Sequence, residues 1–431
     1  MRGISAWGRL LFLLVLVAGV ATSAHGYAVL SHEEVVDMAW TGQLLPLLQQ
    51  RFPGLTADQI KEAHAYAYGG SVIQDIGYYP FGDKEFSDLL HYVRTGDFVS
   101  ALLRDASTPD ELAFALGALA HYYGDTIGHP VVNLVTGEEY PQLRSRFGRL
   151  VTYGDDQTAH LRTEFGFDVV EVAHGNYSQE NYRDFIGFQV AKPLLERAFL
   201  ETYGLQMSDV IKHEDLAIGT YRYAVSTLIP KMTHVALLNY RDQIVSATPS
   251  FDKRKFRYRM RRTEYEKNYG KQYVHAGIGA HILAFFLRLV PKIGPFSALQ
   301  LKLPDADQQT QYLHSMNQAE DAYRATILAL LPSVAEVPLL VDLDFDTGNP
   351  TAEGEYALAD RSYAFLAQQL ALRIKTALPP ALLLANVEAF YVNPSAPDAV
   401  RKDPKKWAQV QAALATLRQA QVSPALPASP L

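Results

Sequence analysis

Two features are missing from the 431-residue sequence: cysteine, and any excess of positive charge. The lack of cysteine excludes disulfides, thiolate metal sites, iron–sulfur clusters and cysteine nucleophiles. A bound metal would therefore need His, Asp, Glu or backbone ligands. The 39 Lys and Arg against 46 Asp and Glu give a net charge of -7, so bulk charge does not favour nucleic acid as a partner. The 48% of hydrophobic and 20% of charged residues are typical of a folded globular protein.

The N-terminus also lacks a hydrophobic run long enough to span a bilayer comfortably. Leu10–Ala21 is apolar, but a transmembrane helix needs roughly 20 such residues. Two arginines precede this run, and the small residues Ala24 and Gly26 follow it, as in a secretory signal peptide. We predict that residues 1–26 are such a signal, and that the exported protein, secreted or periplasmic, starts at Tyr27. Cleavage after Ala24 and an uncleaved membrane anchor are the alternatives. Loss of the two arginines changes the net charge from -7 to -9.

Apolar residues recur every three or four positions along most of the chain, which indicates amphipathic helices. The segments with this pattern are Val35–Leu48, Glu85–Leu103, Pro109–Tyr123, Asn181–Thr202, Leu216–Leu238, Arg361–Ala377 and Pro404–Gln421. We predict a mainly α fold with a helical domain over 27–250. A C-terminal extension of unknown role, mixed but mostly helical, follows over 251–422, and 423–431 is a disordered tail.

Three local features predict interruptions of the helical pattern. Pro130 predicts that the helix containing Leu112–Tyr123 ends near Gly124–Gly128, because proline removes a helical N–H. Asp75 lies in a glycine-flanked stretch that reads as a loop. Pro338–Asp346 alternates like a short strand that ends in an acidic turn.

Histidines and carboxylates recur at a spacing of four residues in the first half of the chain. His121, Asp125 and His129 follow one another at this spacing, as do His160 and Glu164. Four residues make about one helical turn, so neighbouring members share a face and can bind one metal together. A single pair of this kind is more often an exposed helical pair. The recurrence within a short stretch favours a metal site.

The sequence AHYYGDTIGHP at residues 120–130 resembles the central motif of the zinc-dependent phospholipase C family. The wider superfamily includes the fungal zinc-dependent single-strand nucleases and the GPI-anchor-cleaving phospholipase D. Its members are mostly helical and hold three clustered zinc ions. The resemblance covers roughly residues 27–240. The spacing between Asp125 and His129 is closer to the GPI-anchor-cleaving branch, and Tyr27 stands where the other branches usually have Trp.

The resemblance implies a set of ligands for three zinc ions. Asp75, His91, His121 and Asp125 would bind the first. The backbone amine and carbonyl of Tyr27, with His32 and Asp125, would bind the second. His129, His160 and Glu164 would bind the third. Two close cations lower the pKa of a water that both bind. Asp75 is expected to be the general base that takes the proton of this water.

From the resemblance we expect an exported zinc-dependent phosphodiesterase that hydrolyses phospholipids by a metal-activated water. The first alternative is another phosphoester, such as single-stranded nucleic acid. The second alternative is a non-enzymatic binding protein that uses zinc for its stability. No obligate nucleic acid or protein partner is inferred.

Three further features have weaker functional interpretations. The basic and aromatic stretch Lys253–Lys271, with the apolar run Ala276–Val290, could contact an anionic membrane surface over 253–290; a solvated helix face followed by a core helix is the alternative. His64 is near enough to Asp75 in the sequence to support the ligands without binding metal. Asp342, Asp344, Asp346 and Glu353 follow the count of a calcium-binding EF-hand loop, but the glycine is misplaced, so a strand ending in an acidic turn is the better interpretation.

Overall fold

The computed structural model describes residues 29–173, 188–229, 236, 301–330 and 340–422. The predicted signal peptide, Tyr27, the basic stretch Lys253–Lys271, the apolar run Ala276–Val290 and the predicted tail lie outside these residues. The predicted boundary near residue 250 does too, so the division into domains stays a prediction. No helix in the described part of the chain is both long and apolar enough to cross a membrane.

The described residues form a mainly α fold, as predicted from the sequence. Most elements are α-helices, joined by short 3-10 and π-helical turns. Before residue 230 they are α2 (Val29–Ala39), η1 (Trp40–Leu44), α3 (Leu45–Arg51), α4 (Ala57–Gly70), η2 (Ile73–Tyr78), α5 (Lys84–Tyr92), α6 (Thr95–Asp105), α7 (Pro109–Glu139), α8 (Pro141–Phe147), α9 (Gln157–Ala173), α11 (Lys192–Tyr203), α12 (Met207–Val210), α13 (Glu214–Tyr223) and η3 (Ala224–Leu228). After residue 300 they are α17 (Ala306–Leu330), α18 (Ala357–Arg373), α19 (Ala381–Phe390), η6 (Val400–Lys402) and α20 (Pro404–Val422).

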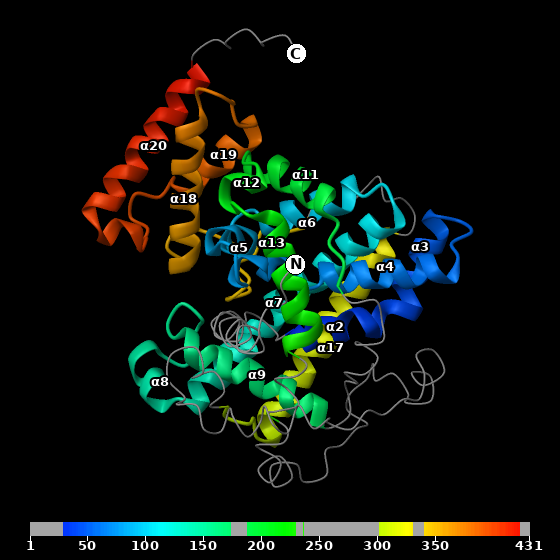
Figure 1. Cartoon of the computed structure of the whole chain (residues 1–431). Coiled ribbons are helices and arrows are strands. Elements are labelled where there is room, and N and C mark those ends of the chain that lie inside the picture. Colours follow the sequence, from blue (N-terminus) through cyan, green and yellow to red (C-terminus); the bar gives the residue numbers. More distant parts are fainter. Residues whose placement is uncertain (1–28, 174–187, 230–235, 237–300, 331–339, 423–431) are drawn as a thin grey trace, which may run out of the picture.

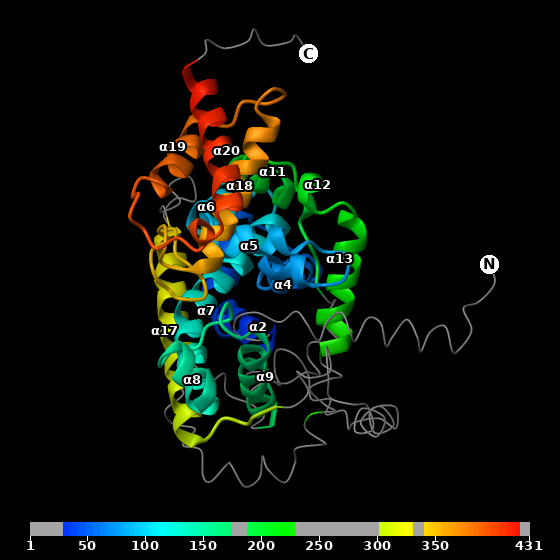
Figure 2. The ribbon, with the colours of Figure 1, turned by 90° about the vertical axis from the view of Figure 1, so that its left-hand side faces the viewer.

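Helix α7 is the centre of the molecule (Figure 1). Its sequence from Leu112 to Ala120 is apolar or glycine at every position, and all of these residues are buried. A helix that is hydrophobic all round must be covered on every side. Helices α2, α4, α6, α9 and α17 accordingly pack around α7, and α17 runs beside it in both ribbon views (Figure 2).

The C-terminal helices belong to the same core. Helix α18 packs on both α5 and α20, and a single cluster of buried apolar side chains extends from Val29 to Leu417. Helix α17 is tied to α7 by two hydroxyls: Tyr323 donates to the carbonyl of Leu116 at 2.9 Å, and Tyr123 bonds Thr326 at 2.6 Å. The described residues after 300 therefore belong to the packing around α7.

Helix α7 does not end where the sequence predicted. It continues through Pro130 to Glu139. Proline removes one hydrogen bond, because the carbonyl of Thr126 has no N–H four residues later. Gly348 packs against this carbonyl and the ring of Pro130, so closely that a Cβ on Gly348 would overlap the oxygen. Gly348 also has a φ of +70°, which favours glycine. The packing of α7 against its neighbours thus outweighs the cost of one lost hydrogen bond.

Two other local predictions were also wrong. Asp75 lies in the 3-10 helix η2 and not in a loop. The described part of Pro338–Asp346 forms no strand, only an antiparallel bridge between Leu343 and Pro350. Its backbone bonds helices instead of a neighbouring strand: the N–H of Phe345 donates to the carbonyl of His91 at 3.1 Å.

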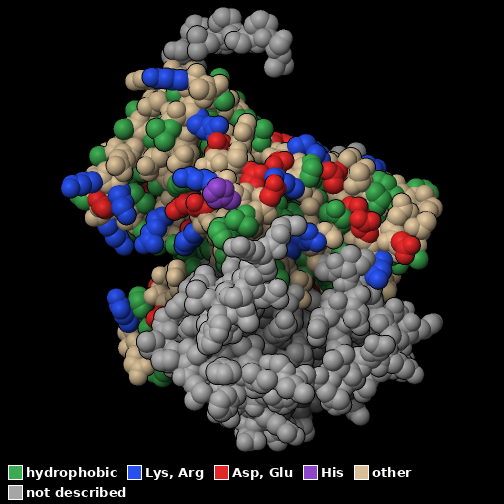
Figure 3. Space-filling model, in the orientation of Figure 1, with side chains coloured by type: hydrophobic (Ala, Val, Ile, Leu, Met, Phe, Trp, Pro, Cys, Tyr) green, Lys and Arg blue, Asp and Glu red, His purple; other side chains and the backbone are tan. Residues whose placement is uncertain are grey.

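The described surface shows no dominance of one charge. On the face in Figure 3, basic and acidic side chains are interspersed over the part that is coloured by type. The predicted basic stretch Lys253–Lys271 lies outside the described residues, so this face does not test it.

Two glycines allow α4 and α7 to cross at very short distance. A Cβ on Gly117 would overlap the carbonyl of Ala67, and a Cβ on Gly70 would overlap the carbonyl of Phe114. Because the backbones meet here, the residue that follows α4, Ser71, reaches α7: its carbonyl oxygen lies 2.9 Å from Nδ1 of His121. The crossing therefore sets the position of a predicted metal ligand.

Replacing Gly117 by Ala tests this crossing. Helix propensity alone would stabilise the variant by about 1 kcal/mol, but the overlap with Ala67 should destabilise the fold by a net amount of roughly 2 kcal/mol. Urea unfolding of the metal-free protein measures the change. Gly219→Ala is the control, since a Cβ there meets nothing within 4 Å, and it should be neutral or slightly stabilising. Equal effects in both variants would contradict the role of the crossing.

Candidate metal centre

The structure brings eight of the nine predicted ligand residues to the middle of α7. Helix α7 supplies His121, Asp125 and His129, because a spacing of four residues places all three on one face. The other five residues come from four different elements: His32 from α2, Asp75 from η2, His91 from α5, and His160 with Glu164 from α9. All eight are buried. The ninth, Tyr27, lies outside the described residues.

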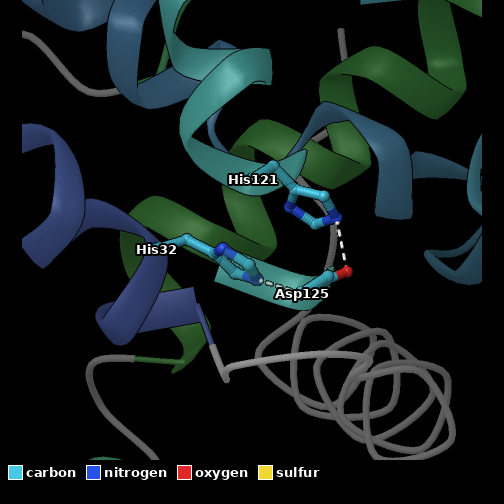
Figure 4. Close-up of side chains that lie close together, drawn as sticks. All are labelled: His32, His121 and Asp125. Carbon is cyan, nitrogen blue, oxygen red and sulfur yellow. Dashed lines mark ion pairs between the residues drawn. The ribbon is translucent and has the colours of Figure 1, made fainter. Parts of the chain in front are cut away.

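The carboxylate of Asp125 lies at the centre of this group. Its Oδ1 is 3.2 Å from Nε2 of His32 and 3.5 Å from Nε2 of His129. Its Oδ2 is 3.0 Å from Nε2 of His121 and 3.5 Å from Nε2 of His91. Figure 4 shows His32 and His121 reaching this carboxylate from two different helices, and their rings stack with centroids 4.2 Å apart.

Two histidines have their protons directed away from the centre. Nδ1 of His91 lies 2.8 Å from the carbonyl oxygen of Ser87, and Nδ1 of His121 lies 2.9 Å from that of Ser71. A carbonyl only accepts, so each Nδ1 carries the hydrogen. When these rings are neutral, both Nε2 atoms carry lone pairs, although they are only 3.5 Å apart. Such a pair needs a proton or a cation close to it.

His129, His160 and Glu164 form a second part of the centre. Nε2 of His160 lies 2.6 Å from Oε1 of Glu164, one turn further along α9. The rings of His129 and His160 have centroids 5.2 Å apart. The potential ligand atoms of these three residues all lie within 4.8 Å of one another, as do those of two other groups: His32 with His121 and Asp125, and Asp75 with His91 and His121.

The buried charges displace the pKa values of these groups. Burial favours neutral Asp125, but His121, His129 and His32 outweigh burial and hold the pKa of this carboxyl well below its usual range. Burial would lower the pKa of His91, but the neighbouring carboxylates of Asp125 and Asp75 outweigh burial and raise this pKa to about 10. Asp125 likewise raises the pKa of His129 against the effect of burial.

The pKa values of His160 and Glu164 on α9 shift in the opposite directions, because burial is the dominant effect there. Burial, reinforced by His129, lowers the pKa of His160 to about 3. Burial raises the pKa of Glu164 well above its usual range. The metal-free centre thus keeps protons on His91, His129 and Glu164, where a divalent cation could replace them.

The residues present fit zinc. Neither oxygen of the buried Asp125 accepts a hydrogen bond from the described residues, and neither does Oδ1 of Asp75. A buried polar atom without a donor costs free energy, which a coordinated cation would offset. Imidazole nitrogen and carboxylate oxygen are ligands that zinc accepts. The ligand assignment itself stays a prediction.

Sequence reasoning missed one residue of this site, Asp346. It lies between α17 and α18, is buried, and has Oδ1 at 2.9 Å from Nδ1 of His129. The acidic run around it was visible in the sequence, but nothing there connects it to a histidine more than two hundred residues earlier. His64, expected near Asp75, instead lies 3.1 Å from Asp37 and stacks on Trp40.

The residues that match an EF-hand count do not converge on one point. Asp342 accepts hydrogen bonds from the first turn of α6, Asp346 faces His129, and Glu353 pairs with Arg401. A calcium loop requires these side chains to surround one ion. Their dispersal excludes that interpretation, which the sequence had already disfavoured.

The fold and the site together define an α-helical protein with a cluster of imidazole and carboxylate ligands around one central helix. Residues 31–212 match the family model described as zinc dependent phospholipase C. This match confirms, over that segment, the resemblance to the zinc-dependent phospholipase C family. All eight described ligand candidates lie within it, whereas Asp346 lies outside. Neither a curated protein nor a solved structure gives a significant match to the chain.

Zinc binding should release protons from the metal-free protein. His91, with a pKa of about 10, is protonated at pH 7 and must lose its proton to bind zinc. The apparent affinity for zinc should therefore fall as the pH is lowered, by about tenfold per pH unit for each proton displaced. Calorimetric titration with zinc in two buffers of different ionisation enthalpy measures the release. Equal heats in both buffers would contradict the predicted protonation.

Proposed function

We propose that this protein is an exported phosphodiesterase that hydrolyses phospholipids at a centre of three zinc ions. The observation that supports it best is the position of Asp125, whose buried carboxylate faces four imidazole nitrogens at 3.0–3.5 Å. The family match over residues 31–212 supports a hydrolase of the phospholipase C type. The net charge of -7 does not favour nucleic acid as the substrate.

The three groups of neighbouring side chains support the proposed ligand sets, and His121 belongs to two of these groups. Asp75, His91, His121 and Asp125 hold the first ion. Tyr27 and His32 hold the second, with Asp125 shared between the two. His129, His160 and Glu164 hold the third. When bound, zinc supplies Lewis acidity toward phosphoryl oxygens and lowers the pKa of water.

Four residues of the chain have further roles in this proposal. Asp75 is the general base that takes a proton from the attacking water; its Oδ1 lies 3.3 Å from Nε2 of His91 and accepts no hydrogen bond from the described residues. Asp125 keeps His32, His91, His121 and His129 oriented toward one point. Ser71 and Ser87 keep the tautomers of His121 and His91 fixed through their carbonyl oxygens.

Asp125→Asn tests the function, because it removes the charge that all four histidines face. Phospholipid hydrolysis should fall by a factor of at least about 1,000, and the zinc content should drop by more than one ion per chain. Phosphate-ester release from vesicles and elemental analysis measure the two effects. Asp88→Asn is the matched control: Asp88 is also buried, on α5, but belongs to none of the ligand sets.

The same assays separate the alternatives. Hydrolysis of single-stranded DNA, with phospholipid untouched, would replace the lipid substrate by nucleic acid. Full zinc content without turnover of either substrate would indicate a zinc-stabilised binding protein. Equal losses in Asp125→Asn and Asp88→Asn would contradict the proposed ligand set.

The proposed export and the backbone ligand at Tyr27 are linked. Asp168 on α9 holds the start of α2, accepting from the N–H of Leu30 at 3.2 Å and from the hydroxyl of Ser31 at 2.8 Å. These contacts fix the chain three residues after Tyr27 and beside His32. A mature N-terminus at Tyr27 would then lie close to the centre.

Sequencing of the exported protein should therefore give Tyr27 as the first residue. Adding two residues before Tyr27 should lower zinc content and activity, because the α-amine becomes an amide that cannot bind metal. The same two residues added after Leu431 serve as the control and should change neither quantity. An N-terminally extended protein with full zinc content would contradict the role of the amine.

A further inference from the structure

Asp346 is held in place from several sides. Its Oδ2 accepts hydrogen bonds from the hydroxyls of Tyr92 at 3.0 Å and Tyr356 at 2.5 Å. Its carbonyl accepts from the side-chain amide of Asn133 at 2.6 Å, and its N–H donates to Asp344 at 2.9 Å. These four contacts leave Oδ1 directed at Nδ1 of His129, 2.9 Å away.

The segment around Asp346 is anchored to the helices that carry the ligands. Phe345 donates its N–H to the carbonyl of His91, and its ring lies edge-on to that imidazole with centroids 5.2 Å apart. Gly348 packs on α7 at the carbonyl of Thr126. The position of Asp346 is thus set by the same helices, α5 and α7, that position His91 and His129.

The support of His129 differs from that of the other two oriented histidines. His91 and His121 direct Nδ1 to carbonyl oxygens of Ser87 and Ser71, which lie inside the family segment 31–212. Nδ1 of His129 instead lies 2.9 Å from the oxygen of a buried carboxylate, and this carboxylate comes from the part of the chain beyond that segment. A carboxylate fixes the tautomer as a carbonyl does, and it also makes the opposite nitrogen a more basic ligand.

We propose that Asp346 is a positioning residue for the metal site of His129, His160 and Glu164, so that the C-terminal part of the chain completes a centre whose eight described ligand residues lie within residues 31–212. Asp346 accepts the Nδ1 hydrogen of His129 and leaves the Nε2 lone pair for the metal. The inference rests on the proposed zinc ligands, but not on the identity of the substrate. A protein lacking this carboxylate would bind one of its metal ions less tightly.

Asp346→Asn in the full-length chain tests the proposal. Zinc titration against a competing chelator should show one class of site weakened by about 10- to 100-fold, with the other sites unchanged. Visible spectra of the cobalt-substituted protein should change as well, since the ligand field at His129 is altered. Asp360→Asn is the matched control: it makes the same change in a buried carboxylate on α18 that bonds the backbone of Gly354 and Ala399, and both readouts should stay as in the wild type.

The experiment gives a different result if Asp346 only holds its own segment in place and does not support His129. Tyr356→Phe removes a hydrogen bond to Asp346 but leaves the carboxylate facing His129. If Asp346 only held the segment, Tyr356→Phe would weaken zinc binding as much as Asp346→Asn does. That outcome, or unchanged zinc affinity in Asp346→Asn, would overturn the proposal.

A second measurement determines the tautomer of His129 in the wild-type protein, so it does not depend on whether a variant at position 346 folds. In the wild-type zinc-loaded protein with ¹⁵N-labelled histidine, His129, assigned by comparison with His129→Gln, should show a protonated Nδ1 and a metal-bound Nε2. The opposite assignment would overturn the proposal. Because zinc affinity and histidine state are measured without substrate, a zinc-binding protein that hydrolyses no phosphodiester would refute the proposed function and leave this inference intact.

Discussion

The arrangement of the molecule depends on one buried carboxylate that faces several imidazoles. Asp125 has no hydrogen-bond donor among the described residues, and four histidines from three helices lie within 3.5 Å of it. Charges at such distances interact strongly away from water, so none of these groups can be buried independently of the others. The helices that carry them must therefore meet at one point on α7. A metal would stabilise this point, and without one the histidines must hold protons in its place.

The surrounding packing satisfies this requirement by bringing backbones unusually close. Gly70 and Gly117 let α4 cross α7 so tightly that a backbone carbonyl can orient His121. Gly348 likewise lets its backbone approach α7, at the carbonyl of Thr126, which has no helical hydrogen bond because of Pro130. In both places the absence of a side chain allows a backbone group to lie next to the ligand helix. Local helix propensity is lost at Gly70 and Gly117, and accurate placement of the ligands is gained.

The sequence was most informative where ligands repeat along one helix. The spacing of His121, Asp125 and His129, and that of His160 and Glu164, predicted neighbours that the structure does bring together, and the helical periodicity predicted the fold class. Prediction failed at Pro130, because the burial that keeps α7 intact comes from residues distant in the sequence. It failed at Asp346 for the same reason: an acidic turn carries no sign of which histidine it will face.

The contact between the 340s and α7 also has a consequence for the order of folding. Asn133 and Asp346 lie 213 positions apart, and contacts of such long range form late because a large loop must close before they are gained. Synthesis proceeds from the N-terminus, so His129 emerges long before its carboxylate partner exists. The centre therefore reaches its final form only after almost the whole polypeptide has been made, and a chain truncated before residue 346 would keep every ligand within 31–212 and still lack the outer support of His129.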